Sequence, residues 1–505
     1  KFSSKFTPAS MTLLRKLAGE TAIYGSGSIL SKVLNYVFLT IYLTRVFNGD
    51  KSQFGIYRDL YFYMALFLII LTFRMETTYF RFAKENRSSV TSMSMAFLAS
   101  LAGFFVAFVW AFKVQIANGM EYPGMTTHLM MLAWVLFFDV LSAVPFASLR
   151  QQNRPWLFLS LRLGSILLNL AFVLFFLELL PRLAAGGGLW EKIYQPGDKL
   201  FYVFLGNLIA SGITFSLLLP LMKKADLGWD FSFLKKMLKY AWPLVIVGIS
   251  GVINQSSYIT FQKWWLPNST TENLSEGGVF AAAASLAILL NLFTVAFNYA
   301  AEPFFFAHQY KENARQVYAD VALAFTIVGA VMMLGILAYM DLVQLLLGKN
   351  FREGLEVVPI LLLSYLLLGV YYNFSTWYKL ADKTLLGALI AGIGSVLTIG
   401  LNYLAIKTFG FGVIGSAWAA LICYLFMCVA SYIQGQKYFP IPYKIVRMAV
   451  WILVSLMIYG LMEWLRQFYE GKTAVVLFVN TVLLLAYIFI IYIFEKSLMK
   501  QLRRT

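Results

Sequence analysis

The chain has 505 residues, of which 60% are hydrophobic and 13% are charged, and its formal net charge is +17. Soluble domains are about half apolar and about a quarter charged, so this composition excludes a soluble enzyme and indicates a protein whose solvent is lipid. The lysines and arginines gather in short loops between apolar segments. This distribution sets membrane topology, and we predict no nucleic-acid partner.

Apolar stretches recur from one end of the chain to the other, Met11 is a plausible natural start, and we assign no role to residues 1–10. A bilayer core of about 30 Å needs about 20 mostly apolar residues per helix. We therefore predict an all-α integral membrane protein with about fourteen transmembrane helices. Lys and Arg are enriched in every second loop, which predicts that both termini are cytoplasmic. The predicted spans are 20–47, 55–82, 89–116, 125–150, 155–180, 198–222, 237–263, 277–307, 316–345, 355–380, 384–408, 411–437, 443–466 and 473–496.

Three pairs of similar segments occur in the same order in the two halves of the chain. Many transporters are built from such repeats, with the substrate site between them, and an even number of helices gives both repeats the same orientation. We predict an N-terminal six-helix lobe at 11–230, a C-terminal six-helix lobe at 231–438, and two additional helices with a basic tail at 439–505. The pairs are FGIY at Phe54 with GGVF at Gly277, ETTYFRFAKEN at Glu76 with EPFFFAHQYKEN at Glu302, and Gly164-Ser165 before Asn169 with Gly394-Ser395 before Asn402.

Motifs at the start of the chain carry a family resemblance. The opening LAGETAIYGSGSILSKVLNYVFLTIYLTRVF from Leu17, the FGIY after it and FRMETTYFRF from Phe73 resemble the multidrug, oligosaccharidyl-lipid and polysaccharide (MOP) flippase superfamily. Within it the chain resembles the bacterial O-antigen and polysaccharide flippases, over essentially its whole length. The resemblance implies a pseudo-twofold pair of lobes, like those of the multidrug and toxin extrusion (MATE) transporters, around a cavity with alternating access. It also implies flipping of a polyprenyl-pyrophosphate-linked oligosaccharide from the cytoplasmic to the outer leaflet of the bacterial inner membrane.

Lipid II flippases are the main relatives with a different cargo. They look similar through SKVL at Ser31 and RVF at Arg45. They usually carry an adjacent Arg-Asp pair in the first helix, at the place where this chain has Phe38-Leu39. Lipid II is therefore the alternative cargo.

Basic residues inside the spans are candidates for binding the pyrophosphate. An ionisable group at the bilayer centre costs at least a few kcal/mol unless it has a partner or a wet cavity. Arginine also presents a fork of donors that matches phosphate oxygens. For Lys32 the alternative is a structural lock with an acidic residue, and for Arg162 it is a snorkelling side chain. The predicted phosphate-binding residues are Lys32, Arg74, Arg150 and Arg162.

Polar and acidic residues inside the spans supply the other candidates. Asn254 and Gln255 open a polar run in span seven that suits sugar hydroxyls, with helix-to-helix hydrogen bonds as the alternative. A coupling ion, either a proton or sodium, would need a carboxylate within the membrane. Glu302 precedes Pro303 and has a second interpretation as the cap of a kinked helix. The predicted ion-coupling residues are Asp139, Glu76 and Glu302.

The sequence also argues against several classes of protein. Cys423 and Cys428 lie in one apolar helix, and the two histidines are far apart, so we predict neither disulfides nor a metal site nor another cofactor. The longest gaps between spans, near 181–197 and 264–276, are too short for a catalytic domain, and we predict that the protein is not an enzyme. We expect a monomer whose partners are the lipid-linked oligosaccharide, membrane lipids and a coupling ion.

Two questions stay open at the level of sequence. A MATE-type antiporter of organic cations is the alternative function, but such a pump needs carboxylates to dominate its cavity, whereas basic residues outnumber acidic ones among the candidates. The last two predicted helices either form a groove for a lipid tail or pack on the second lobe.

Overall fold

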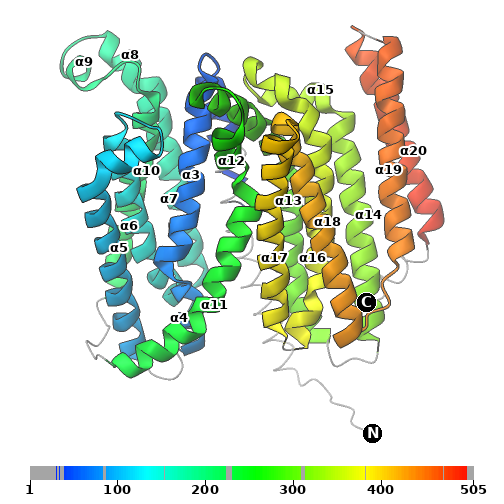
Figure 1. Cartoon of the computed structure of the whole chain (residues 1–505), viewed down its shortest axis with the longest axis horizontal. Helices are drawn as coiled ribbons and strands as arrows, with labels where there is room; N and C mark the ends of the chain where they lie inside the picture. Colours follow the sequence, from blue (N-terminus) through cyan, green and yellow to red (C-terminus); the bar gives the residue numbers. More distant parts are fainter. Residues whose placement is uncertain are drawn as a thin grey trace. The chain divides into compact units, whose positions relative to one another are not determined.

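In the computed structural model, the described residues form helices joined by short loops, with no strand among them (Figure 1). Among these residues, thirteen helices are long and apolar enough to cross a membrane. They match the predicted spans in order from the second to the last, so the all-α membrane fold class is confirmed. The predicted first span lies mostly outside the described residues. The structure describes residues 30, 33–34, 39–82, 87–152, 154–222, 230–308, 313–381, 383–469 and 471–496.

The helices bundle along their lengths, and short 3-10 or π segments extend several of them. The bounds in the first half are α2 Thr40–Val46, α3 Lys51–Thr72, α4 Met75–Phe82, α5 Arg87–Gly119, α6 Thr126–Gln151, α7 Pro155–Leu174, η2 Phe175–Leu179, α8 Leu180–Ala185, α9 Leu189–Ile193, α10 Lys199–Leu218, η3 Leu219–Met222, α11 Phe231–Ser256 and α12 Tyr258–Trp265. Those in the second half are α13 Thr270–His308, α14 Ala314–Ala338, α15 Met340–Val343, η4 Gln344–Leu346, η5 Lys349–Val357, α16 Val358–Leu380, α17 Thr384–Asn402, η6 Tyr403–Thr408, α18 Gly412–Tyr438, α19 Ile445–Arg466, η7 Gln467–Tyr469 and α20 Thr473–Phe494.

Contacts between Cα atoms divide the chain into two compact units. In the first unit, α6 packs against α5 and α10, and α10 also packs against α7. In the second unit, α16 packs against α13 and α18, and α17 covers α18. This division follows contacts, whereas the predicted lobes follow sequence duplication, and the predicted boundaries stay a prediction. The first unit combines Lys1–Asn35 with Tyr57–Val252, and the second combines Tyr36–Ile56 with Ile253–Thr505.

A π-helical segment follows two helices that the predicted duplication pairs. It continues α7 as η2 in the first unit and α17 as η6 in the second unit. Each π segment is one wide turn or little more, and π-helices are rare and occur mostly as such single turns inside α-helices. A duplicated ancestral helix would carry the same irregularity into both copies.

The first turn of α3 packs against α13 within the second unit, at two glycines that the paired motifs FGIY and GGVF contain. A methyl group added to Gly55 would lie 1.9 Å from the carbonyl oxygen of Leu274, and one added to Gly278 would lie 2.7 Å from that of Lys51. Only glycine permits this close approach of two backbones.

Gly55→Ala is therefore expected to lower the free energy of unfolding by about 1–3 kcal/mol, because a backbone carbonyl cannot move aside as a flexible side chain can. The measurement is thermal unfolding of purified protein in detergent. Gly103→Ala in α5 is the matched control, since no atom lies within 4 Å of the added methyl group. Equal unfolding midpoints for the two variants would contradict the expectation.

The two C-terminal helices pack on α14 of the second unit. Toward the end of α19 the guanidinium of Arg466 lies 2.5 Å from the carboxylate of Asp341, and near its start Lys444 lies 2.6 Å from Asp320. In α20 the amide of Asn480 donates to the carbonyl oxygen of Ala338 at 2.8 Å. Polar contacts at both ends of α14 thus hold the pair of helices within the second unit, and a groove for a lipid tail stays a prediction.

Span seven differs from its prediction. The sequence predicts one helix over 237–263, whereas α11 begins earlier at Phe231 and ends at Ser256, and α12 resumes at Tyr258. The hydroxyl of Ser257 donates to the carbonyl oxygen of Ile253 at 2.6 Å. A serine bond of this kind competes with the helical ladder and bends the helix, so the predicted polar run marks a break.

Candidate functional site

Arg74 lies in the two-residue turn that separates α3 from α4. Phe73 and Arg74 both have left-handed backbones, with φ of 47° and 52°. Residues other than glycine seldom adopt this conformation, and its cost is met only where the surroundings impose it. The carbonyl oxygen of Arg74 accepts hydrogen bonds from the amides of Thr77 and Thr78 at 3.1 and 3.2 Å, which starts α4 directly after the turn.

The Arg74 side chain is half-buried against α11 in the first unit. A methyl group added to Gly248 would lie 2.6 Å from Nη2 and 2.8 Å from Nε of Arg74. Arg74 forms no ion pair with a carboxylate in the described part of the chain. Among the described residues, no carboxylate occupies its fork of donors, which has the geometry to bind an anionic ligand.

Arg150, near the end of α6, is shared between a carboxylate and two rings. Its guanidinium lies 3.6 Å from the Glu76 carboxylate and 4.9 Å and 5.6 Å from the ring centroids of Phe80 and Phe158. Its Nε is buried without a hydrogen-bond acceptor among the described residues. The predicted phosphate ligand Arg150 and the predicted coupling residue Glu76 thus lie together, and each partly neutralises the other.

Asp139 and Arg162 belong to a third polar group in the first unit. The Ser211 hydroxyl of α10 donates to Asp139 of α6 at 2.9 Å. The positive charge of Arg162 on α7 acts on the Asp139 carboxylate, and its guanidinium lies 5.5 Å from the Phe146 ring centroid. One helical turn before Ser211, the amide of Asn207 donates to the Tyr61 hydroxyl at 2.6 Å. The arrangement provides a membrane carboxylate with polar neighbours on three other helices.

Sequence reasoning missed two acidic groups of the first unit. Asp59 of α3 is fully buried, and its carboxylate accepts a hydrogen bond from the Tyr122 hydroxyl at 2.5 Å. Burial is the main cause that raises the pKa of Tyr122 well above its usual value, and the negative charge of Asp59 is the second. The hydroxyl therefore keeps its proton. His128 lies 3.1 Å from the carboxylate of Asp198, which also caps α10. Both acids lie near predicted span ends, where an acidic residue ordinarily faces water.

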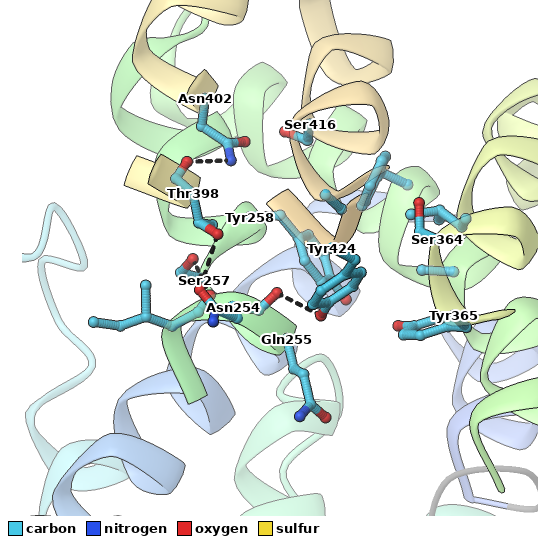
Figure 2. A pocket seen from close by; sticks show the side chains of 15 residues that line it. Asn254, Gln255, Ser257, Tyr258, Ser364, Tyr365, Thr398, Asn402, Ser416 and Tyr424 are labelled. Atoms are coloured by element: carbon cyan, nitrogen blue, oxygen red, sulfur yellow. Dashed lines mark hydrogen bonds between the residues drawn. The ribbon is translucent and has the colours of Figure 1, made fainter. Parts of the chain in front are cut away.

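A pocket in the second unit collects the predicted polar residues of span seven. Asn254 and Gln255 at the end of α11 line it together with side chains from α12, α13, α16, α17 and α18 (Figure 2). Its volume is about 20 Å³, roughly the room that one water molecule needs. The other polar lining residues are Ser257, Tyr258, Ser364, Tyr365, Thr398, Asn402, Ser416 and Tyr424.

Hydrogen bonds organise one wall of the pocket, as Figure 2 shows. The Thr398 hydroxyl donates to the side-chain oxygen of Asn254 at 2.9 Å, and the Tyr424 hydroxyl donates to the Asn254 backbone oxygen at 3.0 Å. The Asn402 amide donates to the Thr398 backbone oxygen at 2.8 Å. The Asn402 side-chain oxygen is buried without a donor among the described residues. Chemically, the pocket offers this oxygen to a hydroxyl group, a water molecule or a small cation.

Tyr424→Phe is expected to lower the free energy of unfolding by about 1 kcal/mol, because it removes one donor from a buried carbonyl while preserving the ring. Tyr432→Phe on the same helix is the control, since the Tyr432 hydroxyl makes no hydrogen bond with a described residue. Thermal unfolding in detergent compares the two. An equal loss in both variants would show that the hydrogen bond to Asn254 is not the cause.

Two predicted site residues cannot be placed. Lys32 lies outside the described residues, and Glu302 belongs to α13 with a side chain outside the described part of the structure. Within the described residues, no three histidine, cysteine or carboxylate side chains come together as a metal site requires. The predicted residues that the structure does place form four separate groups, around Arg74, Arg150, Asp139 and the pocket.

Comparison with known proteins gives the class of this fold. The sequence matches no protein-family model and no curated protein sequence. Among solved structures, the chain is similar to the lipid II flippase MurJ in an inward closed conformation, with a TM-score of 0.73 and 14% identity over 94% of this chain and 99% of that one. It is also similar to a multidrug resistance MATE family transporter of the MOP superfamily. The inward-facing form of that transporter has a TM-score of 0.60 and 13% identity over 86% of this chain and 94% of that one.

The chain is thus an all-α, multi-pass membrane protein with the fold of flippases and transporters. In particular, it has the architecture that MurJ shares with the MATE transporters. Identities this low establish a common fold and do not transfer a cargo. The predicted lobed membrane fold is confirmed, whereas membership of the MOP superfamily and the narrower resemblance to O-antigen flippases stay predictions.

Proposed function

We propose that this protein is a MOP-superfamily flippase that moves a polyprenyl-pyrophosphate-linked oligosaccharide from the cytoplasmic to the outer leaflet by alternating access. We place it in the bacterial inner membrane with both termini in the cytoplasm. The observation that carries the proposal is Arg74, an arginine in a membrane segment, held in a left-handed turn without a carboxylate partner among the described residues. Evolution retains such a charge in the membrane where a function requires it.

The charges of the first unit support an anionic head group. A pyrophosphate carries several oxygens that accept charge-assisted hydrogen bonds, and arginine forks match their geometry. Arg74 offers a complete fork, while Arg150 is partly neutralised by Glu76 at 3.6 Å. Arg162 is exposed on α7, and it adds positive potential next to Asp139. We therefore assign the principal phosphate contact to Arg74 and supporting roles to Arg150 and Arg162.

The polar pocket of the second unit supports a role in sugar recognition or ion binding. Its polar lining side chains are all neutral amides and hydroxyls, groups that pair with sugar hydroxyls without attracting charge. A cavity of about 20 Å³ admits one small polar group rather than a sugar ring, so sugar binding requires a more open state. Asn254 and Gln255 are the residues that we assign to it.

A lipid-linked anion fits the site better than the alternative of an organic cation. A cationic drug would have to enter a site that includes Arg74, which has no carboxylate partner among the described residues. Lipid II, the cargo named for MurJ, is the alternative lipid-linked cargo. The charge of the site does not distinguish these two cargoes, so an experiment in which they compete for transport is needed.

The decisive experiment reconstitutes the purified protein in liposomes with a short-chain polyprenyl diphosphate that carries one N-acetylhexosamine and a fluorophore. Dithionite reduces the fluorophore in the outer leaflet only, so a rise in the reducible fraction measures flipping. We expect flipping of this probe, competition by unlabelled lipid-linked oligosaccharide, and no efflux of ethidium. Ethidium efflux without probe flipping would reject the proposal in favour of an organic cation antiporter, and stronger competition by lipid II would change the cargo.

A further inference from the structure

We propose that Gly248 is a positioning residue for Arg74. Because glycine has no side chain, it leaves a space in α11 that the guanidinium of Arg74 occupies. The inference rests on the proposed function and adds to it a residue that contacts no cargo. Gly248 is buried within the first unit, and its backbone lies in the middle of α11. Since helix interiors favour alanine over glycine, a buried helical glycine needs a packing reason.

The geometry supplies that reason. A methyl group added to Gly248 would lie 2.6 Å from Nη2 and 2.8 Å from Nε of Arg74, and 2.9 Å from Cγ2 of Ile69. Carbon and nitrogen atoms without a bond between them do not approach so closely. The guanidinium therefore occupies the volume that any other side chain at position 248 would fill.

The backbone on the other side of the contact is fixed. The Arg74 carbonyl oxygen accepts three hydrogen bonds, from the amide of Thr77, the amide of Thr78 and the hydroxyl of Thr78, at 3.1–3.2 Å. With φ of 52° at Arg74 and 47° at Phe73, the turn has few conformations available. An added methyl group would therefore move the guanidinium rather than the backbone that carries it.

Displacement of the guanidinium matters because a bidentate phosphate contact requires both donors in place together. The atoms in conflict are the ends of flexible side chains, so Gly248→Ala is expected to fold and to lose affinity for the pyrophosphate. The maximal rate should change less, because the rest of the transport machinery is intact.

The experiment measures flipping of the fluorescent polyprenyl diphosphate probe across a range of probe concentrations. Gly248→Ala is expected to raise the half-saturating concentration by roughly 10-fold, the loss of about one charged hydrogen bond. Gly251→Ala is the matched control, because it lies in the same helix and the added methyl group meets nothing within 4 Å. We expect it to stay within about twofold of the unmodified protein.

A double-mutant cycle identifies the cause. If Gly248 acts through Arg74, then Gly248→Ala added to Arg74→Ala changes the half-saturating concentration by less than about twofold. A full, additive loss in the Arg74→Ala background would overturn the inference. So would normal affinity of Gly248→Ala alongside impaired Arg74→Ala, which leaves the proposed function standing. Normal flipping by Arg74→Ala would instead reject the phosphate role of Arg74 and the positioning role together.

The folding of the same single and double variants provides a second test of the inference. If Gly248→Ala fails to fold, the steric conflict with Arg74 predicts that the double variant Arg74→Ala/Gly248→Ala regains a monodisperse profile in size-exclusion chromatography. If the double variant also fails to fold, a group other than Arg74 conflicts with the added methyl group, and the inference would be wrong.

Discussion

Arg74→Ala is expected to lower the initial rate of probe flipping by about 100-fold at probe concentrations below saturation. The loss of two hydrogen bonds between a charged donor and phosphate costs about 3 kcal/mol, which corresponds to a factor of about 100. Arg74→Lys should recover part of the rate, because it restores the charge without the planar fork. The measurement is the dithionite assay in proteoliposomes at matched protein content.

An arginine outside the proposed site controls for a general effect of charge. Arg182 of α8 is 78% exposed, and its guanidinium lies 3.7 Å from Glu178. Arg182→Ala is expected to flip the probe at the unmodified rate, since exposed ion pairs contribute little. Equal losses in Arg182→Ala and Arg74→Ala would show that net charge, and not the Arg74 site, governs transport.

Asp139→Asn is expected to abolish the stimulation of flipping by an imposed proton gradient while leaving slow equilibration of the probe intact. The asparagine keeps an acceptor for the Ser211 hydroxyl, now 2.9 Å from the carboxylate, so packing should survive. The proton-binding carboxylate is lost, and with it the means of coupling. The measurement compares flipping with and without a pH difference across the proteoliposome membrane.

Two further variants separate the alternatives for the coupling ion. Ser211→Ala keeps the carboxylate and should keep the response to the proton gradient. Asn402→Ala removes the buried oxygen of the second unit's pocket that has no donor among the described residues, and it should abolish a response to sodium if the ion binds there. A normal proton response in Asp139→Asn together with a lost sodium response in Asn402→Ala would move coupling to the pocket.

Part of the candidate site was visible in the sequence because the cost of a charge in lipid is a local property. Arg74, Asp139 and Arg162 stand out against apolar neighbours whatever the fold, and the polar run at Asn254 stands out for the same reason. Asp59 was missed because an acidic residue near the start of a span ordinarily lies in the interface. Only the burial of its side chain beneath Tyr122 distinguishes it.

The partners of these residues could not be predicted, because they come from distant parts of the chain. Glu76 pairs with Arg150 on another helix, and the break in α11 at Ser257 lies beside a carbonyl that accepts a hydrogen bond from Tyr424. In the sequence, Gly248 is one small residue among many in a predicted membrane helix, and it has no feature that links it to Arg74. The periodicity of a helix does not predict which side chain from another helix will occupy the space beside a glycine.

The sequence by itself determined the membrane class, the helical class and the order of the spans from the second to the last, because each depends on the transfer of a continuous apolar segment of about 20 residues into lipid. The tertiary structure alone decided which charges are neutralised, where α3 and α11 are interrupted, and how the C-terminal helices dock on α14. These features depend on contacts between helices that are far apart in the chain. Their energies therefore belong to packing and hydrogen bonding, which no local pattern records.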